Sequence, residues 1–436
     1  MSLRFTSLLM LGTLLSGSLL TRGVAQDQKS VTLDVPGGAD ATPSIAAAGS
    51  FVVVAWGVSA GGKADVFAAT SRDGGVTFGS PVRVNRIRGE GRLGGELPPR
   101  VAVHRGAGPA PTITVLWTAR GAATEIKVAQ SSDGGVTFGA PRALQASGAA
   151  GDRGWTALAA GPDGDAHAVW LDHRGLAARR AAGDAAGKSG SGHHAHASGA
   201  PADGSLMAQG SAIYHASVGQ SVRNERAITT GVCYCCKTAI AAAADGTLFA
   251  AWRHVYPGDL RDIALSVSRD GGRSFSAPAR VSEDGWAING CPDDGPSVAV
   301  GQDGTAHIVW PSVIGRDDPE GALFYASTRD GQRFTARQRI PTLGSPKPMH
   351  PQIALAPGGK VVVAWDELLK GARVAAVRTL TPRGDGSVQV GEATRLAPAG
   401  GASHPVVSGT AEGVVAAWAT GGDDSRVAVR RLRFAR

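Results

Sequence analysis

Short apolar runs that end in tryptophan recur along this chain of 436 residues. Each run has four or five residues, mostly β-branched or small, which is too short for a helix and typical of a buried strand. Seven of the nine tryptophans close such a run, namely Trp56, Trp117, Trp170, Trp252, Trp310, Trp365 and Trp418. Their intervals are similar except for a longer one between Trp170 and Trp252, so we predict a repeated β-unit.

Turn signals precede most of these runs. They are Asp163-Gly164, Asp245-Gly246, Asp303-Gly304 and Gly358-Gly359. Glycine accepts the positive φ that tight hairpin turns require. Each repeat therefore begins strand–turn–strand, with the tryptophan on the second strand.

A second motif follows four of the tryptophans. Its copies are SRDGGVTF at 71–78, SSDGGVTF at 131–138, SRDGGRSF at 268–275 and the shorter TRDGQRF at 328–334. They match the Asp box, S-x-D-x-G-x-T-[FW], and the chain resembles the sialidase-like superfamily of Asp-box (BNR repeat) β-propellers. The resemblance implies an all-β propeller of four-stranded antiparallel blades. In that family the box is a structural turn between the third and fourth strands of a blade, away from the ligand-binding face.

The tryptophan count predicts about seven blades, and six blades with an accessory strand pair is the alternative. A strand around residues 31–35 is expected to complete the last blade. Closing the ring in this way removes exposed sheet edges.

The domain limits follow from composition. Within residues 1–25, the positive charge of Arg4 precedes a mostly apolar stretch from Leu8 to Leu20, and small residues follow up to Ala25. This is the pattern of a cleaved signal peptide, with cleavage expected after Ala25. We therefore expect a periplasmic or secreted protein without a transmembrane segment. Residues 26–436 are expected to form the propeller, with a low-complexity, His-containing insertion at 175–212. Its Ala/Gly/Ser-rich part, residues 175–204, is expected to be a mobile loop.

The formal net charge of +8 is scattered along the chain. A solvated basic surface explains this distribution, and so does attraction to acidic glycans or an anionic cell envelope. With export expected and no basic helix, nucleic acid is excluded as a partner. The expected partner is a glycan or an envelope protein, and the chain is expected to be a monomer.

In a propeller, the loops after the tryptophan strands and the segments that lead into the next blade share one face. Arg100, His350, His404 and Asp366 fall there, but polar and aromatic residues are densest in blades four and five. Aromatic rings stack on sugars while charged groups bind hydroxyls or carboxylates. A salt-bridged rim with packed aromatics is the alternative. The predicted ligand-binding residues are Arg253, His254, Tyr256, Asp259, Asp262, Trp286, Asp293 and Asp294.

Whether the chain is an enzyme stays open at this point. The resemblance implies an exo-sialidase-like glycoside hydrolase as the alternative to a binding protein. That chemistry needs an arginine triad, a tyrosine nucleophile and an acid/base aspartate, but the Arg-Ile-Pro motif that the family usually shows early in the chain is not found in the early part of this sequence. The candidate catalytic residues are Arg174, Arg253, Arg316, Tyr256, Asp262 and Asp293.

The four cysteines are Cys233, Cys235, Cys236 and Cys291. In an exported chain disulfides are expected, with a bridge from the first three to Cys291. A periplasmic copper or zinc protein is the alternative, with a thiolate site near His254 or a tract of His193, His194 and His196. No other cofactor is expected.

Overall fold

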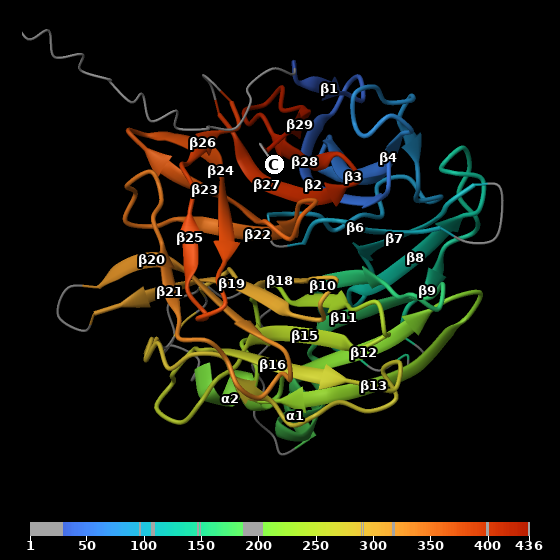
Figure 1. The fold of residues 1–436 in the computed structure, drawn as a ribbon. Helices are drawn as coiled ribbons and strands as arrows, with labels where there is room; N and C mark the ends of the chain where they lie inside the picture. Colours follow the sequence, from blue (N-terminus) through green and yellow to red (C-terminus); the bar gives the residue numbers. More distant parts are fainter. Residues whose placement is uncertain are drawn as a thin grey trace, which may run out of the picture.

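Seven antiparallel β-sheets are arranged as blades around a ring in the computed structural model (Figure 1). The structure describes residues 29–434 except 96, 106–109, 146–147, 149, 186–203, 289, 291, 316–318 and 398–400. The innermost strands of neighbouring blades contact one another around the whole ring. The predicted β-propeller with seven blades is therefore confirmed.

The blades are numbered by the order of their innermost strands, and each contributes four strands, with a fifth in blade 6. From the axis outward, the strands are β2 (Ala39–Ala48), β3 (Phe51–Ala60), β4 (Lys63–Ser71) and β5 (Val82–Arg83) in blade 1; β6 (Arg100–His104), β7 (Thr112–Ala119), β8 (Glu125–Ser131) and β9 (Arg142–Ala143) in blade 2; β10 (Arg153–Ala160), β11 (Ala166–Asp172), β12 (Ala212–Val218) and β13 (Val222–Thr230) in blade 3; β14 (Ala239–Ala242), β15 (Leu248–Arg253), β16 (Ile263–Ser268) and β17 (Ala279–Arg280) in blade 4; β18 (Ser297–Val300), β19 (Ala306–Ile314), β20 (Glu320–Thr328) and β21 (Gln338–Ile340) in blade 5; β22 (Met349–Leu355), β23 (Val361–Leu369), β24 (Ala372–Pro382), β25 (Val388–Val390) and β26 (Thr394–Arg395) in blade 6; and β27 (Ser403–Thr410), β28 (Gly413–Ala419), β29 (Val427–Leu432) and β1 (Val31–Leu33) in blade 7.

Blade 7 is completed by the N-terminal strand. β1 pairs antiparallel with β29, so that Val31 lies opposite Val429 and Leu33 opposite Val427. Figure 1 shows the blue first blade beside the red last blade, with β1 next to β29. The expected ring closure is thus present, and it pairs the outer edge of β29.

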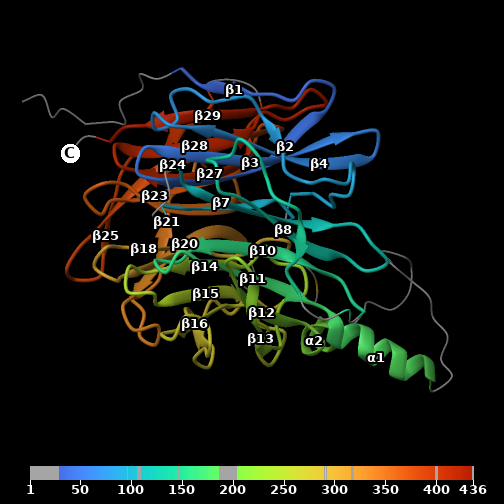
Figure 2. The ribbon, with the colours of Figure 1, turned by 90° about the vertical axis from the view of Figure 1, so that its right-hand side faces the viewer.

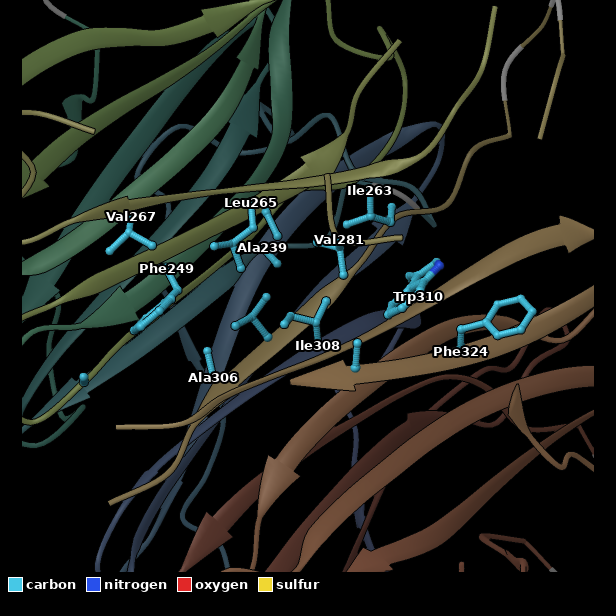
Figure 3. Packing of buried hydrophobic residues seen from close by; sticks show 14 of the residues in the cluster. Ala239, Phe249, Ile263, Leu265, Val267, Val281, Ala306, Ile308, Trp310 and Phe324 are labelled. Carbon is cyan, nitrogen blue, oxygen red and sulfur yellow. The ribbon is translucent and has the colours of Figure 1, made fainter. Parts of the chain in front are cut away.

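The seven tryptophans lie on the second strand of their blades and are at most 2% exposed. Each pair of neighbouring blades is joined by one hydrophobic cluster, which gives seven such clusters among the described residues. In Figure 3, Phe249 and Leu265 of blade 4 face Ile308 and Trp310 of blade 5. Burying each large apolar side chain contributes roughly 1.5–3 kcal/mol, so the interfaces between blades hold the ring together.

The repeated turn motif connects the third and fourth strands of blades 1, 2, 4 and 5. In blade 2, Ser131 Oγ donates to Asp133 Oδ1 at 2.7 Å and Thr137 N donates to the same oxygen at 3.0 Å. Gly135 N donates to Ser131 Oγ at 2.8 Å. Hydrogen bonds from Thr137 and Ser131 lower the pKa of Asp133 to about 2. The aspartate therefore organises its own turn.

The segment between β11 and β12 contains two helices, α1 (Arg174–Ala185) and α2 (Gly204–Gln209). The expectation of a mobile loop over 175–204 is corrected for the part that forms α1. The alanines of α1 have high helix propensity, which favours a helix over a loop here. Figure 2 shows α1 projecting sideways from the blades. His193, His194 and His196 lie outside the described residues, so metal binding there stays a prediction.

Among the residues that the structure describes, neither helix is long and apolar enough to cross a membrane. Residues 1–28 lie outside the described part of the chain, so the signal peptide also stays a prediction.

Candidate functional site

Each of the seven blades has one structurally equivalent residue near the start of its innermost strand. It lies just before the part of that strand that pairs regularly with the tryptophan strand. In blade 1, Ser44 pairs with Ala55, the residue before Trp56, and the register is the same in the other blades. Two residues earlier lies the equivalent position, occupied by Thr42, Pro98, Trp155, Lys237, Gly295, His350 and His404.

Five of these equivalent residues, from five different blades, line a single pocket. Because those blades are distributed around the ring, the pocket lies at the mouth of its axis. We call it the axial pocket. It encloses about 320 Å³, part of which is open to solvent. Its lining residues are Thr42, Pro43, Gly95, Pro98, Arg100, Lys237, His350, Gln352, His404, Pro405 and Val406.

The backbone bends sharply at four of the equivalent positions. Thr42, Trp155, His350 and His404 have φ between 50° and 53°, and the strand register shifts at each of them. A non-glycine residue at positive φ costs about 1–2 kcal/mol. Such strain persists only where the surroundings fix it, and it is concentrated at functional sites.

Asp366 organises the two histidines. It follows Trp365 on β23 and is fully buried. Its carboxylate accepts hydrogen bonds from His350 Nδ1 at 2.9 Å, from Arg373 Nη1 at 2.6 Å and from the His404 amide at 2.6 Å. Burial raises the pKa of Asp366, but His350, Arg373 and the His404 amide outweigh it, so that the net pKa is lowered. Asp366 is therefore an anion that holds both histidine segments.

A second buried carboxylate supports Lys237. Asp294 Oδ1 lies 3.1 Å from Lys237 Nζ, and Asp294 Oδ2 accepts a hydrogen bond from the His350 amide at 2.7 Å. Lys237 Nζ also donates to the Pro351 carbonyl at 3.2 Å. Burial raises the pKa of Asp294, whereas the charges of Lys237 and His350 lower it, with a net lowering. The lysine and the histidines are thus tied together across blades 4, 5 and 6.

The two histidine rings stack, with centroids 4.2 Å apart and planes inclined by 30°. Burial, together with the charge of His350, lowers the pKa of His404 to about 4, so this ring is neutral near pH 7. A Cβ placed on Gly95 would lie 2.8 Å from His404 Nε2. Glycine at this position therefore leaves room for the His404 ring.

The lining favours an anion. It contains two cationic side chains and two histidines, whereas no carboxylate and no tyrosine lines it among the described residues. Donor atoms of His350, Asp366 and His404 lie within 4.8 Å of one another, which is a spacing that could hold a metal ion. However, Asp366 already forms an ion pair with Arg373, and Lys237 lines the same pocket. These positive charges would repel a metal cation and lower its affinity.

The residues predicted in blades 4 and 5 largely form an internal network. Arg253 is buried, its guanidinium donates to the carbonyls of Arg261 and Pro311 at 2.7 Å, and it covers the Trp286 ring at 4.9 Å. Asp262 is buried beside Arg280, whose guanidinium lies 4.6 Å from the Tyr256 ring centroid. Burial raises the pKa of Tyr256 to about 12.

The other predicted residues are dispersed. Asp293 is exposed, and Asp259 lies 3.9 Å from Arg261. His254 accepts a hydrogen bond from Trp252 Nε1 at 3.4 Å, and burial lowers its pKa to about 4. Of the predicted ligand-binding residues, Asp294 contacts Lys237 and His350, which line the axial pocket.

The candidate arginine triad is not assembled by the described residues. Arg174 binds Asp172 and Glu225 in blade 3, while Arg253 is buried between blades 4 and 5. Arg316 lies outside the described residues.

Cys233, Cys235 and Cys236 are buried, and their Sγ atoms lie within 4.8 Å of one another. Cys233 and Cys236 are free thiols. His254 does not belong to this group. Cys291 lies outside the described residues, so the bridge to it stays a prediction.

The site residues that sequence analysis missed are Lys237, Gln352 and Arg373. Arg100, His350, His404 and Asp366 were placed on the correct face but were not selected. A repeated signal marks part of the site, because proline follows the equivalent residue in Thr42-Pro43, His350-Pro351 and His404-Pro405.

No protein-family model and no curated protein matches the sequence. Solved structures share the fold. One is a PL25 ulvan lyase bound to -[GlcA(1-4)Rha3S]-, with a TM-score of 0.56, 9% identity, and coverage of 92% of this chain and 95% of that chain. A second is a protein of unknown function from Dyadobacter fermentans DSM 18053, with a TM-score of 0.51, 13% identity, and coverage of 95% and 100%. A third is the GH93 α-L-arabinofuranosidase of Fusarium graminearum with arabinobiose, with a TM-score of 0.50, 13% identity, and coverage of 92% and 97%. These three structures share the β-propeller fold of this chain.

Proposed function

We propose that this chain is an exported binding propeller whose axial pocket holds the anionic group of an acidic saccharide. The observation that carries the proposal is the lining of the pocket. Two cations and two histidines from four blades converge there, and no carboxylate lines it among the described residues. Charged hydrogen-bond donors of this kind recognise carboxylates and sulfates strongly.

The buried carboxylates Asp294 and Asp366 hold the hydrogen-bond donors of the pocket in position from behind its lining. Asp294 holds Lys237, and Asp366 holds the segments of His350 and His404. Donors that are already held in position lose little conformational freedom when a ligand binds. The pocket is small and partly open to solvent, so it has room for the anionic group of a ligand rather than for a whole oligosaccharide. We infer that it takes one sugar residue of a longer chain.

A glycoside hydrolase is the weaker proposal for this pocket. Hydrolysis of a glycosidic bond generally uses two carboxyl groups that flank the bond. Asp294 and Asp366 are buried, ion-paired and lowered in pKa, which suits neither to donate a proton. The similar ulvan lyase is solved with -[GlcA(1-4)Rha3S]- bound, and this motivates an acidic probe.

Export belongs to the same proposal. It is supported by the apolar stretch from Leu8 to Leu20 followed by small residues up to Ala25. An exported propeller with net charge +8 is suited to meet acidic glycans or an anionic envelope.

The test is isothermal titration of the full chain with a glucuronate-containing oligosaccharide and with its carboxyl-reduced, neutral counterpart. We expect the acidic form to bind and the neutral form to bind at least about ten-fold more weakly, because a hydrogen bond to a charged group contributes about 1.5–3 kcal/mol. Equal binding of the two forms, or binding of neither, would overturn the proposal.

A matched pair of variants locates the site. Arg100 begins β6 in the pocket, and Arg105 follows the other end of the same strand. Both donate from Nε to a backbone carbonyl of a neighbouring blade, at 2.6 Å to Thr156 and 3.2 Å to Ala48. Arg100→Gln should weaken binding of the acidic saccharide about ten-fold, whereas Arg105→Gln should leave it unchanged. Equal effects of the two variants would place the ligand elsewhere.

A further inference from the structure

Cys233 and Cys236 form a close thiol pair behind the axial pocket. Their Sγ atoms lie 3.1 Å apart, in a C-x-x-C spacing, and Cys236 directly precedes Lys237 of the pocket. A disulfide has an S–S distance of about 2.05 Å. The two sulfurs therefore need to approach by only about one ångström to form a bond.

The charges around this pair are unbalanced. Arg261 is fully buried, and its Nη1 lies 3.4 Å from Cys233 Sγ. Its Nε and Nη2 have no hydrogen-bond partner among the described residues, and the nearest carboxylate oxygen, of Asp259, is 3.9 Å away. A buried guanidinium whose carboxylate partner is this distant is costly. A thiolate on Cys233 supplies a closer negative charge.

The neighbouring Arg253 reinforces the same field. Its guanidinium is bonded to backbone carbonyls, which satisfy its hydrogen bonds and leave its charge in place. The hydrogen bond from Cys236 lowers the pKa of Cys233, burial opposes this, and Arg261 and Arg253 lower it further, with a net value of about 6. Burial and the Cys233 charge raise the pKa of Cys236. The two thiols are thus differentiated into an attacking and a resolving sulfur.

We propose that Cys233 and Cys236 are a reversible redox site whose oxidant is a small hydroperoxide. The Cys233 thiolate attacks one peroxide oxygen, the O–O bond breaks, and the released hydroxide or alkoxide takes up a proton. Cys233 becomes a sulfenic acid. Cys236 then attacks the Cys233 sulfur, the S–S bond forms, and water leaves. Overall, two thiols are oxidised to a disulfide, while hydrogen peroxide is reduced to two molecules of water.

The surroundings select this chemistry over two alternatives. Both thiols are at most 2% exposed, so a bulky disulfide such as oxidised glutathione cannot reach them, whereas a hydroperoxide is small and neutral. A metal cation is disfavoured because Arg261 and Arg253 place positive charge beside the sulfurs.

The experiment uses the full chain, reduced and freed of reductant, then exposed to hydrogen peroxide at pH 7. Alkylation after denaturation, which exposes the buried thiols, followed by peptide mass spectrometry reads each cysteine separately. We expect Cys233 and Cys236 together to become protected from alkylation, with the loss of two hydrogen masses, and dithiothreitol to restore both. Oxidised glutathione should not produce this change. Both thiols remaining alkylatable after peroxide, or pairing of Cys233 with another cysteine, would overturn the proposal.

Variants separate the two sulfurs. Cys236→Ser should stop at a sulfenic acid on Cys233 that dimedone traps once the chain is unfolded in its presence, whereas Cys233→Ser should give no dimedone adduct at Cys236. Arg261→Met should slow the oxidation of Cys233 at pH 7, since loss of this positive charge raises the pKa of the thiol. Arg280→Met is the control, because Arg280 pairs with Asp262 instead. An adduct on Cys236 alone, or equal rates in the two arginine variants, would refute the assigned roles.

Discussion

Asp366→Asn tests whether one carboxylate organises the axial pocket. Asp366 is fully buried and accepts hydrogen bonds from His350, from Arg373 and from the His404 amide. An asparagine side chain offers one oxygen and one NH₂ group. Whichever way it is oriented, either Arg373 or the His404 amide then faces another donor and loses its acceptor.

The expected cost follows from these contacts. Removing one partner of a buried ion pair costs roughly 3–5 kcal/mol. The Arg373 side chain is 35% exposed, so solvent weakens its share, and we expect about 3 kcal/mol, at the low end. With about 2.1 cal/mol/K per residue over about 400 residues, this lowers the melting temperature by about 3–4 °C. Affinity for the acidic saccharide should fall as well, because the histidine segments are no longer held.

The assay is thermal unfolding followed by tryptophan fluorescence, with Asp303→Asn as the matched control. Asp303 also pairs with an arginine, Arg329 at 3.0 Å, but the two side chains are 54% and 74% exposed. An exposed pair contributes at most about 1 kcal/mol. If Asp366→Asn unfolds within a degree of Asp303→Asn, the Asp366 charge does not organise the site and the reasoning is wrong.

Two further predictions concern stability. Gly331→Ala should destabilise the ring more than Gly358→Ala by about 1–3 kcal/mol in urea unfolding. Both glycines have positive φ, but only a Cβ on Gly331 would meet another side chain, Val267 at 2.2 Å. Equal unfolding midpoints of the two variants would contradict this packing. Acid should destabilise the protein as the pH falls from about 6.5 toward 4, because burial holds folded histidine pKa values below the unfolded value, His215 at about 3, so the unfolded chain binds more protons. His215→Gln should reduce the slope of unfolding free energy against pH by up to about 1.4 kcal/mol per pH unit in that range, and an unchanged slope would count against a neutral buried His215.

The blades could be predicted from the sequence because their causes are local and repeated. A buried strand that carries a tryptophan packs between two blades, and each repeat fills this interface with similar residues. The turn aspartates, such as Asp133, bond to groups within four residues of themselves, so their role is visible in a short motif. Helix α1 was not anticipated, because composition alone could not distinguish an alanine-rich helix from a loop.

The site was harder to predict because it takes one to three residues from each of five blades. Lys237 and His404 lie far apart in sequence and meet only because the ring closes. The density of charged residues predicted a site in blades 4 and 5, but Arg253 and Asp262 are buried and hydrogen-bonded within the fold. A sequence does not show whether a charge is satisfied internally or offered to a ligand.

The pairing of β1 with β29 also sets the order in which this molecule can be assembled. Val31 is among the first described residues to be synthesised, yet its partner Val429 is among the last. Until nearly the whole chain has emerged, β1 has no strand beside it and blade 7 has an open edge. Contacts of such long sequence separation form slowly, because the intervening chain must first be brought together. The first strand made is therefore the last one placed, and a chain truncated before β29 would leave β1 without its partner.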